Sequence, residues 1–155
     1  MRKTQFILSV LSDALLKLCF GLIFFNYGYG KLKSMITGNS DGLINMVASI
    51  PYFGSFPLFF SWTLALGEMI ILFALIYGLF YSLPFSNFIT KVAGFLSLII
   101  SFVIVYQHVF AWGDNIFSYG PFNFLNASEG KKAIFGQFLF IPISMYIIFN
   151  SRPMY

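Results

Sequence analysis

The chain has 155 residues, of which 59% are hydrophobic, 21% aromatic and only 9% charged. A soluble domain carries about 25% charged residues, so this composition excludes a water-soluble globular protein and indicates an integral membrane protein. The formal net charge is +4, but the cations form no basic run. Their scattered placement argues against nucleic acid as a partner and suits anchoring in the lipid bilayer.

The first membrane span is expected at about residues 10–32. The N-terminus imitates a signal peptide, but Asp13 and Lys17 interrupt its apolar region, so we expect an uncleaved span. Asp13 and Lys17 are spaced to form an i,i+4 ion pair at the edge of the hydrocarbon. For Lys17 we favour snorkelling to the headgroups. Cys19, the only cysteine, excludes an intrachain disulfide and is expected in the core.

Three further apolar segments complete the predicted topology. Spans are expected at about residues 57–83, 87–112 and 132–150, because each is long enough to cross about 30 Å of hydrocarbon at about 1.5 Å per residue. Pro84 helps to end the first of these. The sequence therefore predicts an all-α membrane protein, a four-transmembrane-helix bundle formed by a single domain over residues 1–155.

A short helix is expected between the first two spans. Asp41 can cap a helix that continues to Ile50, and Pro51 then ends it. This helix is much shorter than a span, so we expect it to lie in the membrane interface or under the bundle. Alternation of four spans places five of the nine cations on the side of the N-terminus. The positive-inside rule then favours two cytoplasmic termini.

Glu68 is the most informative residue of the chain. Uncharged stretches of 26 and 22 residues flank it, at 42–67 and 69–90, so it falls near the membrane midplane. A carboxylate at this depth costs about 2.5–3.5 kcal/mol on insertion scales, and such residues usually face the bundle interior and serve a function. The alternative is a protonated Glu68 that hydrogen-bonds a neighbouring helix and only stabilises the bundle.

Alternating spans bring a set of polar residues into the same leaflet as Glu68. His108 shares a helix face with the small residues Gly94, Ser97 and Ser101, so it is expected to point into the bundle. A single histidine is equally compatible with a structural hydrogen bond. We assign candidate catalytic roles to Lys31, Glu68 and His108, and candidate cofactor-binding roles to Asn26, Tyr27, Gln107, Trp112 and Glu129.

These residues favour two kinds of ligand chemistry. A quinone head group needs donors for its carbonyl oxygens, protonatable neighbours and apolar walls, and Lys31, Glu68 and His108 among aromatic residues meet that need. The same residues would serve a proton-coupled transporter. One histidine and scattered carboxylates do not have the spacing of metal ligands, so no metal site is predicted.

Several short motifs lie along most of the chain, from about Leu15 to Phe149. The first span has an apolar run at 18–25 followed by the letters G-Y-G-K-L at 28–32, and the letters G-E-M-I-I-L stand at 67–72. Further features are Ile50-Pro51, His108 and Glu129. Together they resemble the DoxX family of membrane proteins, whose first span ends in G-x-x-K-L and whose second span has an embedded Glu.

The resemblance implies a four-helix protein of the bacterial inner membrane. Members of this family include the DoxD-type subunit of a thiosulfate–quinone oxidoreductase and membrane partners of oxidative-stress enzymes. The chain departs from the family at Lys17, where Arg is usual. It also departs at 150–153, where the G-P-G and S-x-D ending of the fourth span is absent.

The sequence leads to three hypotheses on function. The first is a DoxX-like inner-membrane subunit that binds a quinone or similar lipophilic redox molecule, with a soluble oxidoreductase supplying the electrons. No covalently bound cofactor is expected, and alone the chain would be at most the membrane subunit of such an enzyme. The second is a small-solute or proton-linked transporter, formed by self-association. The third is a non-catalytic scaffold subunit of a membrane complex.

Overall fold

The computed structural model of the chain describes residues 2–111 and 135–150. These residues form five α-helices and one π-helix, and they contain no strand. The all-α class is therefore confirmed for the described part of the chain. The helices are α1 (Arg2–Ile36), α2 (Asp41–Ala48), α3 (Pro57–Gly78), α4 (Ser86–Tyr106), the π-helix η1 (Gln107–Ala111) and α6 (Phe135–Phe149).

Three helices are long and apolar enough to cross a membrane, at Thr4–Ile36, Pro57–Gly78 and Ser86–Phe110. The shorter apolar helix Gly136–Phe149 lies in the predicted fourth span. The 15 residues of α6 reach about 22 Å at 1.5 Å per residue, less than the thickness of the hydrocarbon. These helices confirm the prediction of an integral membrane protein.

Two boundaries of the predicted spans differ from the structure. α1 begins at Arg2 and not near residue 10, so the N-terminal polar residues belong to the helix. α3 ends at Gly78, before the predicted end at residue 83, and Leu79 donates a backbone hydrogen bond to Ile76 in a tighter final turn. The apolar side chains continue past this end, so hydropathy alone could not locate it.

The short helix predicted between the first two spans is present as α2. Asp41 is its first helical residue, and the N-cap is Ser40, so the prediction that Asp41 caps the helix is wrong. The Asp41 carboxylate instead complements the positive end of the helix dipole. The C-cap is Ser49, ahead of the predicted end at Ile50.

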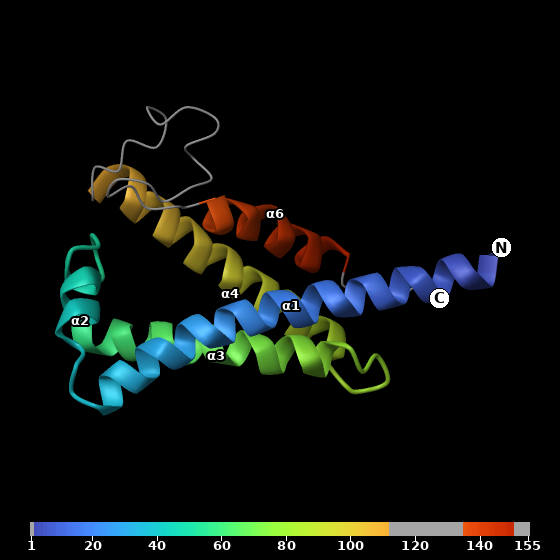
Figure 1. Ribbon diagram of the computed structural model, residues 1–155, viewed down its shortest axis with the longest axis horizontal. Helices are drawn as coiled ribbons and strands as arrows, with labels where there is room; N and C mark the ends of the chain where they lie inside the picture. Colours follow the sequence, from blue (N-terminus) through green and yellow to red (C-terminus); the bar gives the residue numbers. More distant parts are fainter. Residues whose placement is uncertain (1, 112–134, 151–155) are drawn as a thin grey trace.

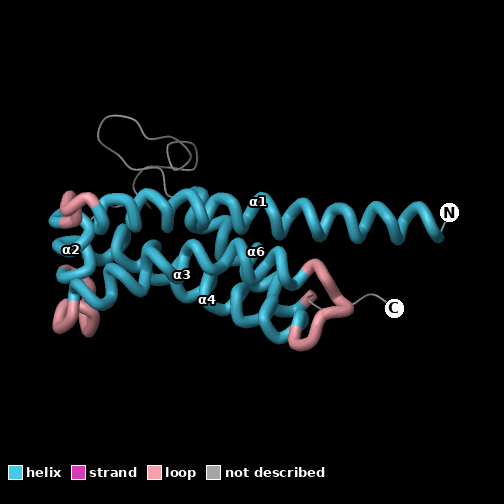
Figure 2. The backbone as a smooth tube through the Cα atoms, turned by 90° about the horizontal axis from the view of Figure 1, so that it is seen from below, coloured by secondary structure: helices cyan, strands magenta, loops and turns pink. Residues whose placement is uncertain are grey.

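The helices are arranged as two packed pairs joined through α3 and α4. α1 packs along α3, and α4 packs against α6. In Figure 1, α4 rises away from α1 and α3 toward the end of the molecule where α2 lies. α2 contacts α3 at this end. Figure 2 shows that the N-terminal part of α1 extends beyond the other helices at the opposite end.

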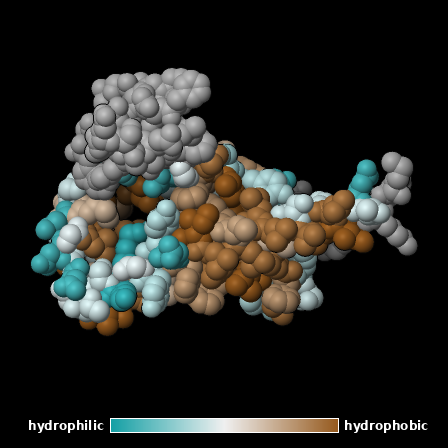
Figure 3. Space-filling view, in the orientation of Figure 1, coloured by the Kyte–Doolittle hydropathy of each residue, from teal (hydrophilic) through white to brown (hydrophobic). Residues whose placement is uncertain are grey.

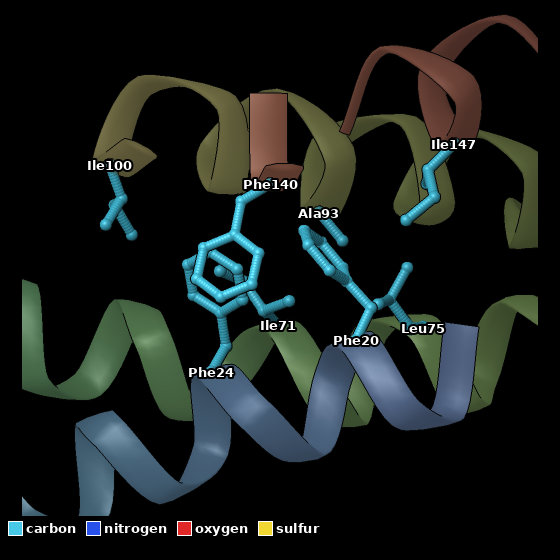
Figure 4. Packing of buried hydrophobic residues seen from close by; sticks show 8 residues of the cluster. All are labelled: Phe20, Phe24, Ile71, Leu75, Ala93, Ile100, Phe140 and Ile147. Carbon is cyan, nitrogen blue, oxygen red and sulfur yellow. The ribbon is translucent and has the colours of Figure 1, made fainter. Parts of the chain in front are cut away.

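Buried side chains from α1, α3, α4 and α6 meet in one core. Phe20 and Phe24 of α1 contact Phe140 of α6, with ring centroids 5.6 and 5.3 Å apart. Tilted and edge-on aromatic pairs of this kind stabilise a contact beyond the area they bury. Figure 4 shows the cluster, which consists of Phe20, Phe24, Ile71, Leu75, Ala93, Ile100, Phe140 and Ile147.

Small residues form the contact between α4 and α6, as predicted. Gly94, Ser97 and Ser101 are buried, and the Ser97 and Ser144 hydroxyls are 2.8 Å apart. A Cβ added at Gly94 would approach Ile148 to 2.9 Å, so the two helices lie very close. Small residues permit this distance, and the serine pair adds an interhelical hydrogen bond.

The outer surface is largely apolar. In Figure 3 hydrophobic residues cover the middle of the visible face, and hydrophilic residues gather at the end where α2 lies. An apolar surface of this extent is unfavourable in water and fits contact with lipid. Cys19 is exposed on α1, so the prediction of a core position is wrong. A thiol is apolar enough to face lipid without cost.

The α1–α3 contact gives a matched test of close helix packing. A Cβ added at Gly28 would lie 2.7 Å from the Ala65 carbonyl oxygen, whereas Gly30 has nothing within 4 Å. We expect Gly28→Ala to lower thermal stability, because overpacking costs about 1–3 kcal/mol. Gly30→Ala should be neutral or stabilising, because alanine favours a helix by about 1 kcal/mol over glycine. Equal melting temperatures of the two variants, measured in one detergent, would contradict the α1–α3 packing.

Candidate functional site

A cavity of about 380 Å³ lies between the two helix pairs, at the end of the molecule where α2 lies. Residues of all six helices line it, and most of them are apolar, among them Phe24, Leu64, Ile100 and Phe140. The face drawn in Figure 3 is hollowed beside α2. A mostly apolar cavity with few polar groups is typical of small-molecule sites in proteins.

The main polar feature of this cavity is an ion pair between α1 and α3. The Nζ of Lys31 lies 2.7 Å from Oε1 and 2.6 Å from Oε2 of Glu68, so the ammonium contacts both carboxylate oxygens. Glu68 is 1% exposed and Lys31 is 21% exposed. Charge-assisted hydrogen bonds of this length offset part of the cost of removing the carboxylate from water. Glu68 points into the interior, as predicted.

Close packing of α1 against α3 positions the two charges. Gly28, one turn before Lys31, lies against Ala65 and Met69, which flank Glu68 on α3. Only glycine allows this approach, because an added Cβ would meet backbone atoms at less than 3 Å. The Tyr27 ring is 5.6 Å from Lys31 Nζ and adds a cation–π contact.

His108 and Gln107 enter the cavity from the π-helix that follows α4. Gln107 is 2% exposed and His108 is 7% exposed, and both line the cavity. The Gln107 amide nitrogen donates to the Ser49 hydroxyl, 3.2 Å away, and that hydroxyl donates to the Met46 carbonyl. This chain of donors fixes the amide orientation and leaves Gln107 Oε1 without a partner in the described structure. π-helical turns are frequent at functional sites.

The structure brings most of the predicted site residues together. Lys31, Glu68 and His108, the three candidate catalytic residues, line the same cavity. Of the candidate cofactor-binding residues, Tyr27 and Gln107 also line it.

Three other predicted residues do not belong to the described site. Asn26 is exposed and absent from the cavity lining, so the structure does not bring it together with the other predicted residues. At about 100° per residue, Asn26 points well away from the helix face that carries Lys31. Trp112 and Glu129 lie outside the described residues.

Several residues of the cavity wall were not predicted from the sequence. Gln137 of α6 lines the cavity, and a polar amide in an apolar segment was a usable signal for it. Met46, Val47 and Ile50 close the cavity from the side of α2. Their apolar character indicated burial but not the surface against which they pack.

A second buried ion pair lies nearer the N-terminus of α1. Lys17 Nζ is 2.6 Å from Asp13 Oδ2, with the two side chains 1% and 7% exposed. The predicted i,i+4 pair is present, but the snorkelling preferred for Lys17 is wrong. Tyr81, in the turn after α3, donates its hydroxyl to the same Asp13 oxygen at 3.2 Å. Burial and the Asp13 carboxylate raise the pKa of Tyr81, so it stays a neutral donor.

No protein-family model, curated protein or solved structure matches this chain. Within residues 2–111 and 135–150 no three His, Cys, Asp or Glu side chains gather as a metal site would require.

The Lys31–Glu68 pair can be tested by a double-mutant cycle. We expect Lys31→Met to lower thermal stability, because removing one partner of a buried ion pair costs about 3–5 kcal/mol. The loss should be smaller in Lys31→Met combined with Glu68→Gln, since no unpaired carboxylate remains. Lys33→Met, which removes an exposed cation on the same helix, serves as the control. Additive effects of the two changes would show that the side chains do not interact.

Proposed function

We propose that this chain binds a quinone or a similar lipophilic redox molecule in the cavity at the Lys31–Glu68 pair. The observation that carries this proposal is an ammonium held on both oxygens of a buried carboxylate, inside a cavity with otherwise mainly apolar walls. Such a site offers a ligand one strong donor, one proton-exchanging group and a low-polarity surround.

Three polar residues of the cavity have a definable part in this binding. Lys31 donates a hydrogen bond to a ligand oxygen. Its ammonium group has three hydrogens, and the contacts with Glu68 do not use all of them. Glu68 takes up or releases a proton at its carboxylate. His108 is a second cavity residue whose imidazole can form a hydrogen bond with the ligand. When bound, a quinone would supply redox chemistry in which electron and proton transfer are linked.

The difference in exposure between the two charged residues supports proton exchange with the outside. Glu68 is almost fully enclosed, whereas Lys31 reaches the surface with 21% of its side chain exposed. A proton can therefore pass between the carboxylate and the surroundings by way of the ammonium, without opening the apolar core around Phe24 and Phe140.

The wider proposal is a DoxX-like subunit of the bacterial inner membrane. It has four spans with both termini in the cytoplasm, and α6 belongs to a fourth span that starts near residue 132. A soluble oxidoreductase is the partner that supplies electrons, because the chain carries no sequence motif for a redox cofactor.

A proton-linked transporter is the second candidate, and one observation favours it. α1 contributes to two ion pairs, Asp13–Lys17 within the helix and Lys31–Glu68 with α3, and Phe20 and Phe24 lie between them along α1. Protonatable groups at two depths on one helix are a feature of proton pathways. The apolar cavity favours the lipophilic ligand over a hydrophilic solute.

Glu68→Gln tests the proposed chemistry. The amide keeps nearly the same size and hydrogen-bonding capacity but cannot exchange a proton. We expect the variant to fold and insert normally while losing quinone-linked activity or growth complementation at matched membrane abundance. Asp41→Asn, which neutralises an exposed carboxylate at the start of α2, should behave as the wild type. Full activity of Glu68→Gln would favour the scaffold hypothesis.

The proposed topology can be tested by cysteine labelling in a Cys19→Ala background. Single cysteines at Ser55 and Ser118 should react with an impermeant thiol reagent added outside intact cells. Cysteines at Ser82 and Ser151 should react only after permeabilisation. Labelling of Ser151 from the same side as Ser118 would exclude a fourth span.

A further inference from the structure

We infer that the ligand of this cavity is an amphiphile from the bilayer, whose polar head lies at Lys31–Glu68 and whose hydrocarbon tail leaves the protein between α3 and α4. This inference rests on the proposed function and deepens it, because it specifies the ligand's hydrocarbon tail and the passage through which that tail reaches the lipid. It also excludes a ligand that enters from water.

The size of the cavity is the first argument. Its volume of about 380 Å³ is at the low end of the range of about 300–1,000 Å³ for small-molecule sites. A ring-sized head group fits such a space, but a long isoprenoid or acyl tail does not fit in addition. A membrane-resident ligand therefore needs an opening through which its tail can reach the lipid.

The packing of α3 against α4 provides this opening. Near the turn that connects them the two helices are in contact, and Gly78 lies against Thr90. Further along, a Cβ added at Gly67 would lie 3.7 Å from the Leu96 side chain. From Gly67 toward the N-terminal end of α3, the residues on the side of α4 line the cavity. Figure 1 shows the two helices diverging in the same direction, toward the end where α2 lies. The cavity lies between the diverging parts of the two helices.

Two residues lie both on the cavity wall and on the lipid-facing surface. Thr63 of α3 and Ile99 of α4 line the cavity and are exposed, Ile99 at 43%. Each belongs to an exposed stripe with the 3–4 residue spacing of one helix face. The stripe on α3 is Phe59, Thr63, Leu66, Ile70 and Phe73, and the stripe on α4 is Phe88, Val92, Phe95, Ile99, Phe102 and Tyr106.

The chemistry of the walls assigns the tail to this side of the cavity. Beside Thr63 and Ile99 the wall is formed by Phe60 and Val103. The Thr63 hydroxyl donates to the Phe59 carbonyl, 2.9 Å away, so it needs no water. A hydrocarbon tail in this passage loses no contact with an apolar environment as it crosses from protein to lipid.

Apart from Thr63 and Glu68 of α3, the polar residues of the cavity lie on elements other than α3 and α4. Tyr27 and Lys31 belong to α1, Gln137 belongs to α6, and Gln107 and His108 belong to η1. The head group is therefore held by α1, α6, η1 and Glu68. The tail passes between the N-terminal half of α3 and the C-terminal half of α4.

A binding experiment with two quinones tests the route. The probes are a benzoquinone with a decyl tail and the same ring with a methyl group in place of the tail. Equilibrium binding is measured on the full chain in lipid nanodiscs, with empty nanodiscs as the blank. The portal variant is Ile99→Trp, and the control is Val92→Trp, a similar change on the same exposed stripe but away from the cavity.

We expect Ile99→Trp to weaken binding of the decyl quinone by about tenfold or more, a loss of at least about 1.4 kcal/mol. Binding of the tailless quinone should stay at the wild-type level, which also shows that the variant is folded. Val92→Trp should bind both probes normally. Thr63→Trp, compared with Leu66→Trp, repeats the test from the α3 side.

Two results would overturn the inference in different ways. Unchanged binding of both quinones by Ile99→Trp and Thr63→Trp would exclude the passage between α3 and α4 while leaving the proposed function intact. Failure of the wild type to bind either quinone would remove the proposed function, and this inference with it.

Discussion

The buried carboxylate of Glu68 needs a cation, and much of the fold follows from how that need is met. A charge in an apolar interior is tolerated only when it is paired with good geometry. Lys31 meets this condition with two contacts of 2.6 and 2.7 Å. The pair requires α1 to lie close along α3 in one register, and Gly28 permits that distance. A shift of one residue in either helix would separate the charges.

The same ion pair explains why the cavity lies where it does. The two helix pairs are tightly joined around Phe20, Phe24 and Phe140, and they separate toward the end where α2 lies. Lys31 and Glu68 occupy this wider end and contribute its strongest polar groups. α2 and η1 cover it, linked by the hydrogen bond between Gln107 and Ser49. The result is a small cavity with its ion pair on one wall.

Much of this arrangement was predictable because ionisable residues are rare in apolar segments. Glu68 was identifiable from its position alone, and His108 from the small residues that share its helix face. α2 was identifiable from its length and its flanking Pro51. Each of these predictions depends on the residue types in one short segment and does not require knowledge of the tertiary packing.

Other features depend on contacts that a sequence pattern does not specify. Lys17 looks like a lysine at the membrane edge, yet it is buried because Asp13 and Tyr81 surround it. Asn26 seemed part of the polar group, but its helix face points outward. The end of α3 at Gly78 has no change in hydropathy to mark it. Tertiary partners decide all three.

The central claim is that the Lys31–Glu68 pair receives the polar head of a lipophilic ligand. The most direct test is an experimental structure of the protein with the decyl benzoquinone bound. The account predicts the ring inside the cavity, with one ring oxygen within about 3.2 Å of Lys31 Nζ. A cavity closed by side chains, with the ion pair unchanged and the quinone only on the outer surface, would contradict it.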